Sequence, residues 1–150
     1  MRLLVTGSSG MLGSALVHLG QERGDELHTP SSSELDITDP ESVAQVAAGR
    51  YPAGWCINCA AYTAVDGAEE EPDEAYAVNA LGPGLLARAC ATAGIRLLHI
   101  STDFVFDGTK GEPYVEEDRP NPLGVYGRSK LEGELAVLEA GFEPFVHPGD

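Results

Sequence analysis

The chain has 150 residues, about the length of one domain and enough to bury a hydrophobic core. Its formal net charge is -15 at pH 7 with only nine lysines and arginines, scattered along the sequence, so it lacks the clustered cations that binding to DNA, RNA or an anionic membrane surface requires. With 43% hydrophobic and 22% charged residues, the composition is typical of a soluble globular protein.

Short apolar segments alternate with helical patterns along the whole chain. In chain order, hydrophobic periodicity and end signals predict a strand at 2–6, a helix at 11–23, a strand at 26–29, a helix starting at 38–41, a strand at 55–60, a helix at 74–94, a strand at 97–101 and a helix at 127–140. Strands that are apolar throughout and separated by helices indicate a parallel sheet covered on both faces, a doubly wound α/β fold. The stretch 104–123, rich in glycine, proline and charge, is predicted to be a loop.

Membrane and metal sites are not indicated. No apolar run approaches the roughly 20 residues of a membrane-spanning helix, and the start of the chain shows no secretory signal, so we expect a cytoplasmic location. Cys56 and Cys59 form a C-x-x-C, which raises a zinc or redox site as one interpretation. In a strand, however, residues three apart point to opposite faces, and no second cysteine pair completes a zinc site. We therefore interpret them as core cysteines.

A glycine motif follows the first predicted strand. Gly7, Gly10 and Gly13 form a G-x-x-G-x-x-G that opens the first predicted helix. Glycines at these points permit a tight turn, close approach of the backbone to a pyrophosphate and close helix packing, while the helix start offers free N–H groups. The alternative is a glycine-rich turn without a ligand, but the strand, turn and helix context favours nucleotide binding.

The end of the second predicted strand leaves the cofactor open. An NAD site is expected to place an acid there for the ribose hydroxyls, but the sequence continues into Pro30-Ser31-Ser32-Ser33, with neither an acid nor an arginine. Serine hydroxyls can hydrogen-bond either a ribose hydroxyl or a phosphate. NADH and NADPH therefore both remain candidates.

Tyr126 and Lys130 are spaced so that they share one face of a helix. A lysine ammonium beside a phenol favours the phenolate, so we expect it to lower the tyrosine pKa and make it a usable general acid or base. Such a pair also occurs by chance on solvated helices. Thr102, at the end of the fourth predicted strand, can either cap the strand end or donate a hydrogen bond to a substrate carbonyl where negative charge develops.

Several sequence blocks, in this order, resemble the extended short-chain dehydrogenase/reductase superfamily, in the branch that modifies nucleotide sugars. Beside the glycine motif, these blocks lie at 33–40, 57–66, 76–80, 99–108 and 121–130. The resemblance implies a three-layer, Rossmann-type domain at 1–139 and reduction of the 4-keto group of a nucleotide-sugar substrate by NADPH or NADH. Oligomeric state is left open, with a homodimer as one option.

The resemblance also implies roles for individual residues. Tyr126 would give a proton to the sugar C4 oxygen, Lys130 would bind the nicotinamide ribose, Thr102 would polarise the carbonyl, and Asp103 would face the substrate. The remaining cofactor contacts would be Gly7, Gly10, Met11, Leu12 and Gly13 at the pyrophosphate, Asp36 and Ile37 at the adenine side, and Ala60, Ala61, Tyr62 and Thr63 at the middle of the cofactor.

The chain also departs from that family. Some members bind magnesium through a carboxylate on the first helix, where this chain has Ala15, so we expect no metal. Family members are about twice as long and carry a second, substrate-binding lobe, which is absent from this sequence. Residues 140–150, with Gly141, Pro144 and Pro148, do not resemble the family's next strand, and we interpret them as an atypical tail, truncated or altered, of a fragment with weak or no activity.

Other functions on the same fold stay open. One is a non-catalytic nucleotide-binding or regulatory subunit, like the family relative that partners methionine adenosyltransferase. The intact Tyr126 and Lys130 favour an enzyme, since a binding protein needs no tuned acid. Another is an epimerase or dehydratase of nucleotide sugars. Phe104 stands where a dehydratase carries a glutamate base, which argues against elimination chemistry.

Overall fold

Four parallel strands form the centre of the structure, a computed structural model that describes residues 1–142. The strands are β1 (Arg2–Thr6), β2 (Glu26–His28), β3 (Trp55–Asn58) and β4 (Arg96–His99). Their order in the sheet is β2-β1-β3-β4, and all three pairings are parallel. Because β2 and β3 lie on opposite sides of β1, the strand order reverses there. Ligand crevices of open α/β sheets occur at such a reversal.

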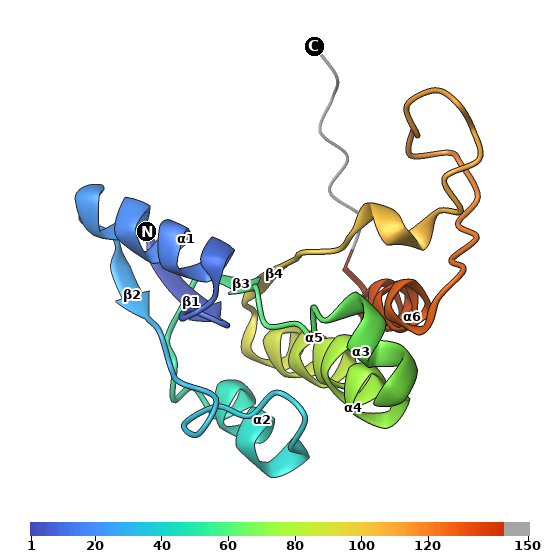
Figure 1. Cartoon of the computed structure of the whole chain (residues 1–150). Helices are drawn as coiled ribbons and strands as arrows, with labels where there is room; N and C mark the ends of the chain where they lie inside the picture. Colours follow the sequence, from blue (N-terminus) through green and yellow to red (C-terminus); the bar gives the residue numbers. More distant parts are fainter. Residues whose placement is uncertain (143–150) are drawn as a thin grey trace.

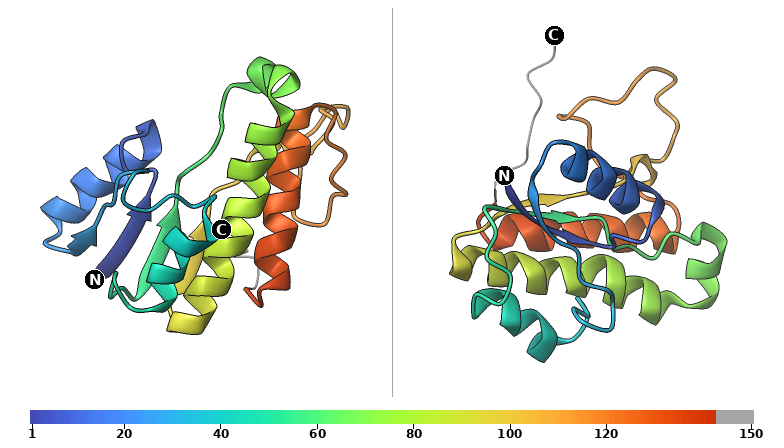
Figure 2. Two further views of the ribbon diagram at one scale, coloured as in Figure 1. Left: turned by 90° about the horizontal axis from the view of Figure 1, so that it is seen from below. Right: turned by 90° about the vertical axis from the view of Figure 1, so that its left-hand side faces the viewer.

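Helices cover both faces of this sheet, which confirms the predicted doubly wound, three-layer fold. Figure 2 shows α1 on one face, with α2, α5 and α6 on the other, and Figure 1 gives their order along the chain. The helical segments are α1 (Met11–Glu22), α2 (Pro40–Ala47), α3 (Val65–Glu70), α4 (Pro72–Tyr76), η1 (Ala77–Leu81), α5 (Gly82–Ala93), η2 (Asp103–Val105) and α6 (Val125–Glu139).

The main hydrophobic core lies between the sheet and the helices α2 and α5. Leu4 and Cys56 point from β1 and β3 into this layer, where they meet Val46 of α2 and Leu86 of α5, all completely buried. Burying one such aliphatic side chain stabilises the fold by roughly 1.5–3 kcal/mol. Phe142 packs against the same cluster, so the first residues after α6 still contribute to the core.

Local chemistry explains where the first helices begin and end. Asp39 caps α2 by accepting hydrogen bonds from the N–H groups of Glu41 and Ser42, and Pro40 occupies the first helical position, as the sequence predicted. After α1, Gly24 adopts a φ of +68°, a conformation that stops the helix and that glycine adopts without strain.

The helix predicted at 74–94 differs from the observed one in two ways. It starts at Pro72, and its middle is a π-helical turn, η1, rather than a regular α-helix. Pro83 has no N–H with which to bond the carbonyl four residues earlier, that of Asn79, which is consistent with a widened turn at this point. A separate short helix, α3, was not predicted.

The helix predicted at 127–140 begins two residues earlier, at Val125. The Val125 N–H donates a hydrogen bond of 2.7 Å to Glu69 of α3, a residue distant in sequence, so this start was not apparent from local signals. The predicted loop 104–123 is irregular apart from η2 at its start, and it projects from the rest of the molecule (Figure 1). None of the helices within residues 1–142 is long and apolar enough to cross a membrane.

The two cysteines of the C-x-x-C have different surroundings. Cys56 is buried in the core, as predicted, and it neighbours Cys90 of α5. Cys59 is half-buried and lines a pocket instead, so the prediction of a core position was wrong for this residue. It lies beyond the end of β3, where the chain has already left the sheet. Across residues 1–142, no group of three or more potential metal-ligating side chains occurs.

Candidate functional site

The glycine turn between β1 and α1 has no room for a side chain at Gly7 or Gly13. Gly7 has a φ of +63°, and a Cβ atom there would lie 2.5 Å from the backbone nitrogen of Ala60. A Cβ atom at Gly13 would overlap the carbonyl of Gly7. Helix α1 begins after Gly10 with no side-chain cap and no acid in its first turn, which leaves its first N–H groups free for an anion.

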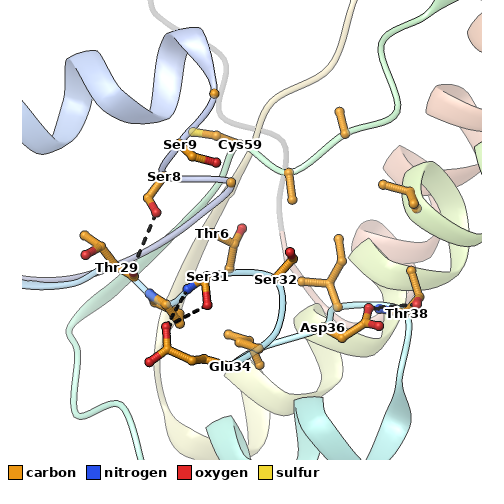
Figure 3. A pocket seen from close by; sticks show the side chains of 18 residues that line it. Thr6, Ser8, Ser9, Thr29, Ser31, Ser32, Glu34, Asp36, Thr38 and Cys59 are labelled. Carbon is orange, nitrogen blue, oxygen red and sulfur yellow. Dashed lines mark hydrogen bonds between the residues drawn. The ribbon is translucent and has the colours of Figure 1, made fainter.

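A pocket of about 490 Å³ opens beside this turn, at the carboxyl ends of β1, β2 and β3 (Figure 3). It lies where the strand order reverses, the position expected for a nucleotide. Its lining consists of Thr6, Gly7, Ser8, Ser9, Gly10, Thr29, Pro30, Ser31, Ser32, Glu34, Leu35, Asp36, Ile37, Thr38, Cys59, Ala60, Ala61 and Val78. The predicted cofactor residues in this lining are Gly7, Gly10, Asp36, Ile37, Ala60 and Ala61.

The remaining predicted cofactor residues lie outside the pocket lining. Met11 and Leu12 are exposed at the start of α1, and Gly13 is buried under the turn. Tyr62 and Thr63 follow the end of β3, and the Tyr62 hydroxyl donates to Glu71, which raises the tyrosine pKa to about 12.

An acid that the sequence analysis missed lies in the pocket. Glu34 sits beyond the serine run after β2 and folds back, so that its Oε2 accepts hydrogen bonds of 2.8 Å from both the N–H and the hydroxyl of Ser31. These two bonds, and the nearby Arg50, hold the pKa of the Glu34 carboxyl below its usual value. The spacing of about 20 residues from a glycine motif, expected for a ribose-binding acid, could have identified it.

Lys130 is almost completely buried on α6 and lies behind the pocket. Its Nζ donates a 2.6 Å hydrogen bond to the carbonyl of Ile100, just beyond β4. Burial lowers its pKa from 10.5 to about 8, while the neighbouring Glu134 and Cys59 act in the opposite direction. Cys59 neighbours Lys130 and also lines the pocket, so the lysine lies beside the pocket. Its ammonium group has two further N–H groups available as donors.

Tyr126 lies one turn before Lys130 on the same helix, as the spacing predicted. Its half-buried ring packs edge-on against Phe104, with ring centres 5.6 Å apart. Within the described residues, no hydrogen bond joins the Tyr126 hydroxyl to the Lys130 ammonium. The structure therefore places the two groups on one helix, while the role of each in proton transfer stays a prediction.

Thr102 and Asp103 stand between β4 and the long loop. The Thr102 hydroxyl oxygen accepts a 3.3 Å hydrogen bond from the Phe104 N–H and so caps the short helix η2, rather than the strand end considered from the sequence. It also donates to the Asp103 carboxylate at 3.3 Å. Phe104, two residues after Thr102, packs against the Tyr126 ring and so links this segment to the start of α6.

Two chains of buried and partly buried hydrogen bonds connect these segments. In the first, the Thr6 hydroxyl donates to the Asn58 side-chain oxygen at 2.6 Å, and the Asn58 amide donates to Nδ1 of His99 at 3.0 Å. The His99 Nε2 is buried without a hydrogen-bond partner among the described residues. Burial, together with the charge of Lys130, lowers the His99 pKa to about 4, so this imidazole is neutral at pH 7.

The second chain is centred on Asn79 in the π-helical turn η1. Its side chain accepts a hydrogen bond from the N–H of Tyr62 and donates to the Tyr62 carbonyl and to the hydroxyl of Ser129, at distances of 2.9–3.1 Å. The Ser129 hydroxyl in turn donates to the carbonyl of Tyr126. Asn79 thus ties the segment after β3 to the first turns of α6.

Comparison with known proteins agrees with this geometry. Residues 1–146 match the family model described as RmlD substrate binding domain. The chain belongs to this RmlD family. It is 51% identical over 143 residues to the dTDP-4-dehydrorhamnose reductase of Mycobacterium tuberculosis strain CDC 1551, a match that covers 93% of this chain and 46% of that protein.

Solved structures of RmlD-type proteins have the same fold. The dTDP-4-dehydrorhamnose reductase of Clostridium acetobutylicum superposes with a TM-score of 0.89 at 41% identity, covering 93% of this chain and 50% of that one. The reductase of Bacillus anthracis, solved in complex with NADP, gives a TM-score of 0.88 at 40% identity, covering 93% and 49%. The chain therefore spans about half the length of the relatives that it matches.

The membership confirms the resemblance seen in the sequence, but three features of this RmlD chain were not anticipated. These are the folded-back Glu34, the long-range contact of Glu69 with the start of α6, and the chain of hydrogen bonds from Asn58 to His99. Each depends on residues far apart in sequence or on the course of a turn. Only the spacing of Glu34 from the glycine motif offered a signal.

Proposed function

We propose that this chain is the cofactor-binding and proton-donating part of a dTDP-4-dehydrorhamnose reductase, which reduces the 4-keto group of dTDP-4-dehydrorhamnose with NADH or NADPH. The observation that carries the proposal is the position of Lys130, buried at the carboxyl end of β4 beside the pocket, in a chain 51% identical to such a reductase. We further propose residues 1–139 as the cofactor-binding domain. The sequence analysis predicted an atypical tail at 140–150, and residues 143–150 of it lie outside the part of the chain that the structure describes.

The pocket has the features that a dinucleotide requires. The backbone of Gly7 and Gly13 leaves no room for side chains, so a pyrophosphate can approach the free N–H groups at the start of α1. Asp36 and Ile37 line the opposite side and would contact the adenosine part. When bound there, the nicotinamide ring supplies the hydride.

The chain's own residues would then act on the substrate oxygen. Tyr126 would donate a proton to the C4 oxygen, and Thr102 would hydrogen-bond the same oxygen and stabilise its developing negative charge. Lys130, held by the Ile100 carbonyl, keeps two N–H donors that would bind the nicotinamide ribose. The nucleotide sugar would bind in front of these groups.

The test uses the full-length protein, dTDP-4-dehydrorhamnose and either cofactor, followed by the loss of nicotinamide absorbance. Tyr126→Phe is expected to lower kcat by about 100-fold or more, the usual contribution of a general acid. Tyr76→Phe, which removes the hydroxyl of a half-buried residue outside the pocket, serves as the matched control and should keep activity. Unchanged turnover in Tyr126→Phe would exclude the tyrosine, whereas cofactor binding without any turnover would favour a non-catalytic binding subunit.

A further inference from the structure

The adenosine end of the pocket contains carboxylates and hydroxyls but no cation. Glu34 and Asp36 are its two charged residues, and serines and threonines supply most of its other polar side chains (Figure 3). The sequence has nine lysines and arginines, and none of them belongs to the pocket lining. The 2′-phosphate that distinguishes NADPH from NADH would therefore meet two carboxylates here and no lysine or arginine.

Glu34 is the acid best placed to contact a ribose. Its Oε2 is fixed by the N–H and hydroxyl of Ser31, both at 2.8 Å, while Oε1 accepts no hydrogen bond from the described residues. Asp36 is bonded in the same way, since its Oδ1 accepts from both the N–H and the hydroxyl of Thr38, but it lies two residues farther from the end of β2, where a ribose-binding acid is expected. The bonds from Ser31 also keep the Glu34 pKa below its usual value, so the carboxylate is charged at pH 7.

We propose that Glu34 selects the cofactor that lacks a 2′-phosphate, so that this chain prefers NADH to NADPH. The preference rests on the proposed dinucleotide site. A ribose 2′-hydroxyl can donate a hydrogen bond to the free Oε1 of Glu34, whereas a 2′-phosphate carries about two negative charges and would be repelled by it. Sites that accept the 2′-phosphate instead place an arginine nearby.

Arg50 is the cation whose charge acts on this acid, and its guanidinium contacts other residues. Its guanidinium donates to the side chain of Gln45 and lies 5.6 Å from the centre of the Tyr51 ring. The positive charge of Arg50 helps to lower the Glu34 pKa, but Arg50 does not line the pocket. The Bacillus anthracis relative was solved with NADP, so the family fold accepts this cofactor, and the preference for NADH stems from the side chains of this chain.

The test measures dissociation constants of the 150-residue chain for NADH and NADPH by nicotinamide fluorescence. Wild type should bind NADH at least about tenfold more tightly, the scale expected for a like-charge contact near a protein surface. Glu34→Gln keeps an acceptor for Ser31 and removes only the charge, so it should bring the two constants within about threefold, mainly through tighter NADPH binding. Glu41→Gln on α2, outside the pocket, is the matched control and should keep the wild-type ratio.

A second pair of probes isolates the 2′ position. AMP and adenosine 2′,5′-bisphosphate differ only in that phosphate, so AMP should compete better in wild type and lose its advantage in Glu34→Gln. Equal or tighter binding of NADPH by wild type, or an unchanged ratio in Glu34→Gln, would overturn the preference and leave the proposed function standing. Failure to bind either dinucleotide would overturn both.

Discussion

The glycine turn beside β1 and the helix α6, which carries Tyr126 and Lys130, build their parts of the site in different ways. At the glycine turn, the backbone approaches other backbone so closely that Gly7 and Gly13 have no room for a Cβ atom. At α6, in contrast, Lys130 is held by the backbone carbonyl of Ile100, and side chains from α3, η1 and η2 contact the first turns of the helix. The first region therefore depends on a few short-range positions, whereas the second depends on long-range hydrogen bonds.

Gly13→Ala should have the largest effect and acts on the pocket only. The added methyl group overlaps the Gly7 carbonyl, so the turn must open and α1 must move away from the pyrophosphate position. We expect binding of the cofactor to weaken by about 100-fold, or roughly 2.8 kcal/mol, measured by fluorescence titration. Gly54→Ala, where the methyl group would meet only the Arg2 carbonyl at 3.8 Å, should bind normally. Equal binding by both variants would show that close packing of the turn is not required.

Asn79→Ala tests the second region, the contacts that hold α6. It leaves the N–H and carbonyl of Tyr62 and the hydroxyl of Ser129 without their partner in a buried position. Leaving such groups unpaired costs about 1–3 kcal/mol, so the free energy of unfolding should fall by roughly 2.5 kcal/mol in urea titrations. Thr92→Ala, which removes an exposed hydroxyl bonded within α5, is the control. A fall no larger than that of the control would mean that Asn79 does not join the segments.

His99 makes the stability of the second region depend on pH. Its pKa is about 4 in the folded protein and about 6.5 when unfolded, so between these values the unfolded chain binds a proton that the folded chain does not. Stability is therefore lost as pH falls below about 6.5, and from pH 7 to pH 5 this single group should cost about 2 kcal/mol.

The measurement is urea unfolding of wild type and His99→Gln at both pH values. Glutamine can still accept the hydrogen bond from Asn58 but does not titrate, so the variant should lose about 2 kcal/mol less between pH 7 and pH 5. His18→Gln, at an exposed position on α1, should behave as wild type. Parallel pH dependence of wild type and His99→Gln would contradict the assignment.

Glu69→Ala should have the smallest effect and tests how α6 is anchored. The Glu69 carboxylate accepts from the Val125 N–H at the start of the helix, where Gly124 offers no side-chain cap. Loss of a helix cap costs about 1 kcal/mol of unfolding free energy. Glu69→Gln keeps the hydrogen bond and should lose about half of that, whereas Glu70→Ala should lose nothing. A loss in Glu70→Ala equal to that in Glu69→Ala would point to general charge effects instead.

Much of the first region could be predicted from the sequence. The glycine turn, the strand before it, the helix after it and the capped start of α2 all follow from local rules, because glycine, proline and capping residues act within a few positions. The same rules placed Tyr126 and Lys130 on one helix. They missed Glu34, since its approach to the pocket depends on how the serine run turns back toward β2.

The sequence by itself determined the doubly wound α/β fold, the place of the nucleotide turn and the spacing of the tyrosine and lysine, because each rests on local periodicity or on residue types with special backbone geometry. Only the tertiary structure decided that Lys130 is buried against Ile100, that Asn79 and Glu69 hold α6, and that Glu34, which is not adjacent to β2, supplies an acid to the pocket. These contacts join residues brought together by the crossing of strands and helices. Their partners are set by packing, which no local pattern encodes.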